Sequence, residues 1–381
     1  MHNRIDEIKS FLSHQDYSLA VRRMLDICLD SSDNQLLINA ILWSRLFRKH
    51  EKENAANPLP DEFFKQADTL LNQLHNTNNS AAAQQQMLIN VTNISKTYSK
   101  GNFSLHPISL ALKTSEVMGV VGENGNGKTT LLRCLAGQLA LDSGNIAYIK
   151  LKQPDFYDIK HHVAFIPQRI PKWYGLLKDN LHFSASLAGV TGEQNELMVA
   201  FMLERLNLTD YAHLTWAQIS SGYRTRFELA RILLQKPSLL ILDEPLANLD
   251  INAQQTILTD LRYMAKSVYH PMGIILSSQQ LHEVEKVADT VLLIKKGSCL
   301  FRTGDETQST QGFALELETT ADRNVLVEIL GDDNVQVQYN GGFYTITSTA
   351  YSVNKIITDL LNKDVPVTYF RDITHSTKRY F

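Results

Sequence analysis

Apolar residues recur every three or four positions along the first 75 residues, which is the spacing of one helix face. These stripes contain Ile5, Ile8, Phe11, Leu12, Leu25, Leu29, Leu36, Ala40, Trp43 and Phe47. A break at Asn57–Pro60 precedes a further stripe over 63–74. The pattern predicts about four helices packed as a small bundle over 1–75. Its apolar stripes form the bundle core or, alternatively, a binding surface.

A polar, uncharged stretch, NTNNSAAAQQQM, occupies residues 76–87 and is typical of a flexible linker. From 88 to 305 the pattern changes, because short, fully apolar runs alternate with helical patterns. The runs are 117–121, 162–166, 239–242 and 273–276. Strands that are apolar throughout are buried on both faces, which predicts an α/β domain built on a mostly parallel sheet.

A polar hinge at 304–312 separates this domain from the end of the chain. Beyond it, apolar and polar residues alternate as in strands, with helical patterns between them. The strand-like runs are 313–317, 335–338, 343–346 and 365–370, and the helical patterns are 321–330 and 352–362. Residues 312–381 are therefore expected to form a small α+β domain.

Composition excludes some classes of protein. Lys and Arg total 37 against 40 Asp and Glu, so no nucleic-acid partner is expected. Cys28, Cys134 and Cys299 lie far apart without metal-ligand spacing, which indicates reduced thiols. The start, MHNRIDEIKS, lacks a signal peptide's apolar region, and no apolar stretch reaches the length of about 18 residues that spans a bilayer. Work at a membrane would need a partner.

The segment 122–130, GENGNGKTT, fits the phosphate-loop pattern G-x-x-x-x-G-K-[ST]. It has the required context, because it follows the apolar run 117–121 and precedes a helical pattern. Its glycines let backbone N–H groups point at phosphates near a helix N-terminus. Lys128 can reach the β- and γ-phosphates, and the Thr129 hydroxyl can hold Mg²⁺. The expected nucleotide-binding residues are Gly122, Asn124, Gly125, Asn126, Gly127, Lys128, Thr129 and Thr130.

The apolar run 239–242 ends in two acids, Asp243 and Glu244. Buried strands rarely end in two carboxylates unless a cation lies beside them. Together with the phosphate loop, this pattern predicts that Asp243 holds Mg²⁺ through water. Glu244 would polarise the attacking water as general base.

Residues 88–302 resemble the nucleotide-binding domain of an ABC transporter, since four further motifs follow in that family's order. They are Ile94–Tyr98, Phe165–Arg169, Ile219–Tyr223 and Leu246–Asp250. The resemblance implies that Tyr98 stacks on adenine, although a lone tyrosine is also common in surface packing. It implies that Gln168 joins Thr129 and Asp243 as a metal residue. The positions that would meet the γ-phosphate of ATP on another subunit are Ser220, Ser221 and Gly222.

Three positions depart from the family's pattern. Ser221 replaces a signature glycine, which matters little if its φ is negative, and Tyr223 replaces a glutamine. Gln279 stands where the family has a switch histidine, and an amide cannot carry a proton. We expect slower hydrolysis, because Glu244 is intact; His282 is either a substitute or an ordinary surface histidine. The expected catalytic residues are Glu244, Gln279 and Lys128.

The resemblance implies a function and partners. A single phosphate loop implies that the working unit holds two copies of the chain or a paired homologue. A homodimer is the expected form, with ATP bound between its subunits and Leu246–Asp250 crossing the interface. Region 168–180 would receive a polytopic permease, with Trp173, Tyr174 and Leu177 lining a groove or packing internally. The C-terminal domain, with Tyr369–Ile373 near its end, loosely resembles those of exporter-type ATPase subunits. This chain would then be the ATPase of an exporter at the cytoplasmic face of the membrane. The alternatives are a soluble non-transporter ABC ATPase and an ATP-dependent regulator.

Overall fold

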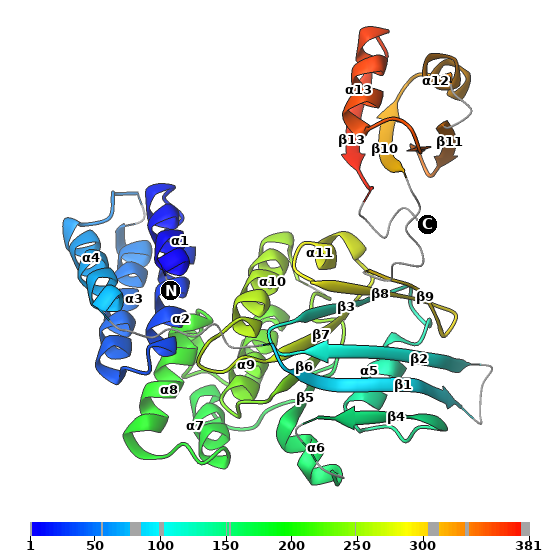
Figure 1. Ribbon diagram of the computed structural model, residues 1–381. Coiled ribbons are helices and arrows are strands. Elements are labelled where there is room, and N and C mark those ends of the chain that lie inside the picture. The colour runs from blue at the N-terminus through cyan, green and yellow to red at the C-terminus, as the bar shows by residue number, and fades with distance from the viewer. Residues whose placement is uncertain are drawn as a thin grey trace.

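The computed structural model describes residues 2–54, 56–76, 85–98, 103–149, 151, 154–247, 249–303, 312–331 and 335–374 (Figure 1). Most of the predicted linker at 76–87 and of the predicted hinge at 304–312 lies outside these residues, as does Asn248 of the Leu246–Asp250 motif. Among the described residues, no helix is both long and apolar enough to cross a bilayer.

Four helices open the chain, as the apolar spacing predicts. They are α1 (His2–Ser13), α2 (Tyr17–Asp30), α3 (Asn34–Asn54) and α4 (Asp61–Asn76). Asp16 caps α2 by accepting a hydrogen bond from the backbone N–H of Leu19. Trp43 of α3 stacks on Phe63 of α4 with ring centroids 4.7 Å apart, and both side chains are buried. The stripes are therefore mainly core, which confirms the first of the two interpretations.

The central sheet has the order β5-β6-β7-β3-β8-β9, and its first five strands are parallel. Its strands are β3 (Val117–Val121), β5 (Val163–Ile166), β6 (Leu239–Leu242), β7 (Gly273–Ser278), β8 (Thr290–Lys295) and the antiparallel β9 (Ser298–Arg302). This confirms the predicted parallel sheet. One face packs on α5 (Lys128–Leu135), and the other on α10 (Ile251–Ala265) and α11 (Leu281–Glu285). This sheet and these helices are called the core lobe below.

An antiparallel sheet of order β2-β1-β4 covers α5 and was not singled out from the sequence. Its strands are β1 (Met87–Thr97), β2 (Ser104–Lys113) and β4 (Ser143–Tyr148). The short helix α6 (Phe156–His162) precedes β5 and includes His162, which the sequence placed in the strand.

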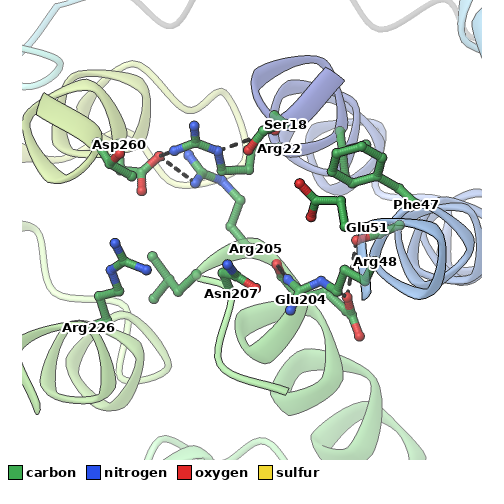
Figure 2. Close-up of a pocket in the computed structure, with 14 residues that line it drawn as sticks. Ser18, Arg22, Phe47, Arg48, Glu51, Glu204, Arg205, Asn207, Arg226 and Asp260 are labelled. Atoms are coloured by element: carbon green, nitrogen blue, oxygen red, sulfur yellow. Dashed lines mark hydrogen bonds and ion pairs between the residues drawn. The ribbon is translucent and has the colours of Figure 1, made fainter. Parts of the chain in front are cut away.

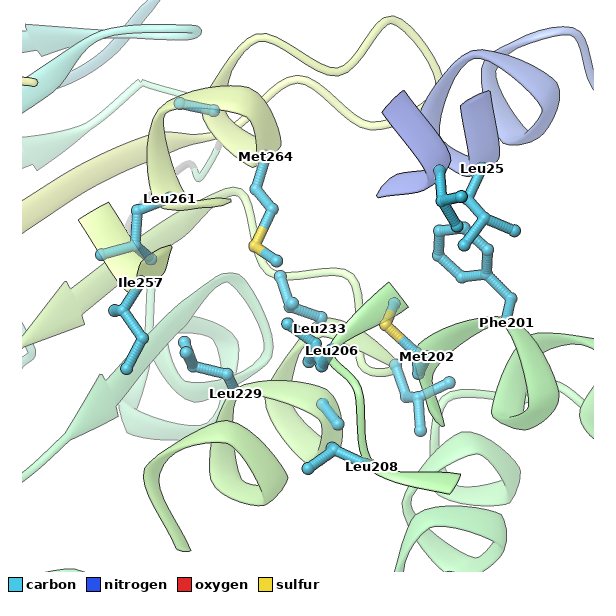
Figure 3. Packing of buried hydrophobic residues seen from close by; sticks show 14 of the residues in the cluster. Leu25, Phe201, Met202, Leu206, Leu208, Leu229, Leu233, Ile257, Leu261 and Met264 are labelled. Carbon is cyan, nitrogen blue, oxygen red and sulfur yellow. The ribbon is translucent and has the colours of Figure 1, made fainter. Parts of the chain in front are cut away.

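A helical lobe is inserted in the chain between β5 and β6 (Figure 1). It consists of α7 (Leu177–Leu187), α8 (Gly192–Arg205), two 3₁₀ turns at Thr209–Tyr211 and Trp216–Gln218, and α9 (Ser221–Leu233). The N-terminal helices pack on this lobe. Leu25 of α2 lies beside Phe201 and Met202 of α8 (Figure 3). One buried apolar cluster thus runs through the N-terminal helices, the helical lobe and one face of the central sheet.

The chain ends in a separate antiparallel sheet of order β11-β12-β10-β13 (Figure 1). Its elements are β10 (Phe313–Thr319), α12 (Arg323–Leu330), β11 (Val335–Asn340), β12 (Phe343–Ser348), α13 (Val353–Asn362) and β13 (Val367–Asp372). The last strand begins later than predicted, because Pro366 has no N–H to donate to the ladder. Arg371 of β13 lies 3.7 Å from the Glu285 carboxylate of α11.

Candidate functional site

The phosphate loop connects β3 to α5, as the motif requires. Gly127 is left-handed at φ +101° and immediately precedes α5. A Cβ at Gly127 would lie 2.5 Å from the Phe103 ring, and one at Gly122 would lie 2.3 Å from the carbonyl oxygen of Ile294. A Cβ at Gly125, by contrast, would meet no atom within 4 Å. The loop is thus packed tightly at both ends and open in its middle, which suits a phosphate cradle.

Asn126 fastens this loop to the neighbouring turn. Its side-chain oxygen accepts a hydrogen bond of 2.9 Å from the backbone N–H of Lys296. Its carbonyl oxygen accepts one of 3.1 Å from the N–H of Gly297. The side chain of Asn126 is therefore used in shaping the loop, whereas Asn124 is exposed.

Lys128 is folded back over the loop and is almost fully buried. Its ammonium donates to the carbonyl oxygens of Gly122 at 2.6 Å and of Glu123 at 3.1 Å. It also lies 3.1 Å from Oε1 of Glu244. The cation therefore connects the phosphate loop to the acidic end of β6.

Asp243 lies against the first turn of α5. One oxygen of its carboxylate accepts a 2.8 Å hydrogen bond from the Thr129 hydroxyl, and the other accepts one of 2.8 Å from the Ser277 hydroxyl. A carboxylate and a hydroxyl that face each other beside a phosphate loop provide the hard oxygen donors that Mg²⁺ prefers. The donor chemistry of this pair therefore fits magnesium.

Glu244, the next residue after Asp243, has a left-handed backbone conformation with φ +50°. Its N–H donates a 2.9 Å hydrogen bond to the Ser277 hydroxyl. Oε1 is buried and forms an ion pair with the ammonium of Lys128. Among the described residues, no group donates a hydrogen bond to this oxygen. A buried carboxylate oxygen with unused acceptor capacity suits the role of a general base.

Ser277 is the residue of this site that sequence analysis missed. It is fully buried on β7, and its one hydroxyl group links the Asp243 carboxylate to the Glu244 backbone. Two adjacent serines at the end of a buried, otherwise apolar strand, next to the strand that ends in two acids, were the available signal.

Replacing Ser277 by alanine is expected to lower the ATPase rate by about tenfold, because two buried groups lose their hydrogen-bond partner. Ser277→Thr keeps the hydroxyl and should retain most of the activity. Phosphate release, measured over a range of Mg²⁺ concentrations, checks this. Equal rates and equal Mg²⁺ requirements in the parent and the alanine variant would show that Ser277 does not position the acids.

Tyr98 lies at the edge of the same loop and is about one-third exposed. Its hydroxyl is 3.3 Å from that of Thr130. Gln168 and Gln279 are exposed just beyond the ends of β5 and β7, and within the described ranges neither side chain bonds to the acids. The carboxyl ends of the parallel strands thus place these glutamines at one edge of the sheet.

The signature segment lies apart from this cluster, at the start of α9 on the helical lobe (Figure 1). Ser220 immediately precedes the helix, and its side chain makes no capping hydrogen bond. Ser221 is the first helical residue, so its φ is negative and the glycine is not needed there. A Cβ at Gly222 would approach Leu249 to 3.2 Å. Asp250 caps α10 by accepting from the N–H of Ala253.

The predicted groove after Gln168 needs a correction. Trp173 is buried, stacks on Trp216 at 4.9 Å and donates its N–H to the Glu228 carboxylate. Leu177 is buried as well. Only Tyr174 is exposed, at 82%. Internal packing, the alternative interpretation, is therefore right for Trp173 and Leu177, because the helical lobe folds over them.

His282 is an exposed residue of α11. Partial burial, with Arg371 and Lys286 nearby, lowers its pKa below the usual range for histidine. A neutral imidazole cannot supply positive charge to a phosphate, which favours the surface-histidine interpretation.

Comparison with known proteins shows the family to which the chain belongs. A family model described as "ABC transporter" matches residues 105–247, from β2 to the end of the acidic motif. The ABC transporter ATP-binding protein YxlF of Bacillus subtilis, itself uncharacterized, is 31% identical over 212 residues, which cover 55% of this chain and 68% of that protein. The linearmycin resistance ATP-binding protein LnrL of the same organism is 30% identical, over 56% of this chain and 68% of its own. The chain belongs to the ABC transporter ATP-binding family.

Further relatives and solved structures agree with this assignment. The phosphonates import ATP-binding protein PhnC of Treponema denticola is 27% identical over 56% of this chain and 89% of its own. The structure of cbiO1 from Clostridium perfringens, part of the ABC transporter complex cbiONQ, covers 57% of this chain and 88% of its own, at 24% identity and a TM-score of 0.51. That likeness shows the ABC fold. The chain is therefore an ATP-binding, transport-coupled ATPase.

Proposed function

We propose that two copies of this chain close around two ATP–Mg²⁺ and drive a separate membrane subunit. The observation that supports hydrolysis best is the geometry of Glu244, whose buried Oε1 lacks a hydrogen bond beside the phosphate loop. An ATP-binding protein without hydrolysis would not need a base held there. The proposed units are the helical bundle 1–75, the linker 76–87, the ABC domain 88–305 and the C-terminal domain 312–381.

In the proposed site, residues of the core lobe act on one ATP. Lys128 moves from Glu244 to the β- and γ-phosphates, while the N–H groups of the loop bind the phosphate oxygens. Thr129, Gln168 and Asp243 would hold Mg²⁺, which would supply positive charge beside the phosphates. Glu244 accepts a proton from the attacking water. Tyr98 stacks on adenine, and Gln279 donates its amide N–H to the γ-phosphate.

The placement of the signature supports the proposed dimerisation. Ser220 and the N–H groups at the start of α9 lie on the helical lobe, away from the phosphate loop of the same chain. The positive end of a helix attracts anions, so this helix start would serve the γ-phosphate bound by a second copy. One phosphate loop per chain then gives two sites per homodimer.

The membrane subunit would dock on region 168–180, where Tyr174 is the exposed aromatic residue. This places the chain at the cytoplasmic face of the membrane through that partner. Export is the proposed direction, on the loose resemblance of the C-terminal domain to those of exporter ATPases. The relatives are mostly import-type, such as the phosphonate importer, and include one resistance protein, so their names do not support export.

Restoring the switch histidine tests the role of Gln279. The variant Gln279→His is expected to hydrolyse ATP at the parent rate or up to about tenfold faster, because imidazolium adds charge at the γ-phosphate. Steady-state phosphate release measures the effect. A collapse of hydrolysis would show that the amide of Gln279 has a role of its own.

Isolation of partners tests the transporter function. The Glu244→Gln variant, tagged and extracted from its host in mild detergent with ATP and Mg²⁺, should bring a polytopic membrane protein in stoichiometric amount. Recovery of ribosomal or DNA-associated proteins, or of the chain alone, would instead support a soluble ATPase. If the Glu244→Gln variant forms an ATP-bound dimer but the parent protein releases no phosphate, the result would support an ATP-dependent regulator.

A further inference from the structure

Arg205, the last residue of α8, joins three parts of the molecule. Its side chain is 1% exposed and contacts two carboxylates on other elements. It donates to Asp26 of α2 at 2.6 and 3.0 Å, and to Asp260 of α10 at 2.7 Å. The N-terminal helices, the helical lobe and the core lobe therefore meet at one buried guanidinium (Figure 2).

Further contacts tie the N-terminal helices to the core lobe, among them hydrogen bonds to Asp30 of α2 from Ser267 and Tyr269, just after α10. Arg22 of α2 donates to the same Asp260 carboxylate at 2.9 Å, as Figure 2 shows. The Tyr263 hydroxyl of α10 donates to Glu7 of α1 at 2.9 Å, and the Arg23 guanidinium lies 3.7 Å from the centre of the Tyr263 ring. Buried polar pairs fix the relative positions of the helices that they join, because each group would lose its hydrogen-bond partner if the two packed surfaces slid past each other.

A second set of contacts ties the N-terminal helices to the helical lobe alone. Glu204, whose side chain is fully buried, accepts from the Ser44 hydroxyl at 3.1 Å and from Nε of Arg48 at 2.9 Å. Both donors belong to α3. Burial lowers the pKa of Arg48, as expected for a cation held inside this interface.

Only two segments of the chain link the helical lobe covalently to the core lobe. The helical lobe is inserted between β5 and β6, so its covalent links to the core lobe are the segments 167–176 and 234–238. A lobe attached through two loops can pivot as a hinged body. The signature residue Ser220 lies on that lobe and the phosphate loop on the other, so the angle between lobes sets where the signature faces.

We propose that the N-terminal helices are an interlobe brace: by binding α8 and α10 together through Asp26 and Arg22, they restrict rotation of the helical lobe against the core lobe. The brace thereby holds the helical lobe, and with it the signature, in one orientation relative to the phosphate loop. Rotation of the helical lobe would then require the Arg22–Asp260 and Asp26–Arg205 ion pairs to break. A ligand or membrane subunit that loosens α2 would thereby change the position of the signature.

The double variant Arg22→Ala/Asp26→Asn tests the brace. It cuts both ion pairs that reach from α2 across the interface, while Arg205 and Asp260 keep each other as partners. Lys52→Ala is the matched control, because Lys52 pairs with Asp210 of the helical lobe, and that pair does not reach the core lobe. All forms are measured as full-length chains without nucleotide, so the result does not depend on the proposed transport function.

Spin labels report the angle between lobes. One label goes on Cys299, which is exposed on β9, and another on a cysteine introduced at the exposed Glu196 of α8; Cys28 and Cys134 are buried. We expect the double variant to broaden the distance distribution about twofold, as for a hinge released from fixed packing. The parent and Lys52→Ala should give the same narrow distribution. A double variant as narrow as the parent would overturn the brace.

If the double variant does not fold, Tyr263→Phe replaces it. This change removes only the hydroxyl that binds Glu7 and keeps the ring beneath Arg23. Amide exchange is then followed in α8 and α10. The brace predicts exchange about tenfold faster at the contact residues of both helices, since each local opening loses a restraint. Faster exchange in α10 alone, with α8 unchanged, would contradict a link between the lobes.

Discussion

Replacing Glu244 by glutamine is expected to slow ATP hydrolysis by about 10²- to 10⁴-fold, the usual loss when a general base is removed. The amide has nearly the same shape as the carboxylate but cannot accept the proton of water. ATP should still bind, because Lys128, Thr129 and Asp243 are unchanged. The charge of Lys128 would even be freed for the phosphates, since its ion pair with Oε1 disappears.

Phosphate release and retention of labelled ATP measure this variant, and size-exclusion chromatography with ATP and Mg²⁺ shows whether it dimerises. Glu123→Gln is the matched control, because it makes the same chemical change at an exposed carboxylate of the phosphate loop. That control should keep the parent rate and elute as the parent does. Hydrolysis by Glu244→Gln at the parent rate would remove Glu244 as the base.

The sequence predicted those parts of the site whose structure depends on a short, continuous motif. Residues 122–130 need a strand before them and a helix after them, and β3 and α5 supply both. Asp243 lies beside Thr129 because parallel neighbours bring their carboxyl ends to the same edge of the sheet. The roles assigned to Tyr98, Gln168 and the signature remain predictions, since they concern ligands and a second subunit.

The parts that the sequence did not predict depend on contacts between distant segments. Ser277 is one of two serines that end a buried strand, and only the pairing of β6 with β7 brings its hydroxyl to the two acids. Arg205 ends an ordinary helical pattern, yet it bonds to Asp26, far away in the sequence. Trp173 looked like a surface aromatic until α9 supplied the Glu228 carboxylate that its N–H needs.

Replacing Lys128 by alanine is expected to weaken ATP binding by about 10²-fold or more. The ammonium is the one side-chain cation that the described phosphate loop presents, and charge-assisted hydrogen bonds to phosphate are among the strongest in proteins. Loss of one such buried contact corresponds to about 3 kcal/mol or more, which is a factor of roughly 10² in the dissociation constant. Hydrolysis should fall with binding, since less ATP would be positioned near Glu244.

Isothermal titration calorimetry with ATP and Mg²⁺ measures this loss directly. Lys96→Ala is the control, because Lys96 is also cationic but pairs with Asp142 on the surface of β1. It should bind ATP as the parent does. Lys128 also donates to Gly122 and Glu123, so its removal could loosen the fold; thermal unfolding therefore accompanies each titration. A folded Lys128→Ala protein with near-parent affinity would mean that the nucleotide phosphates do not lie in this loop.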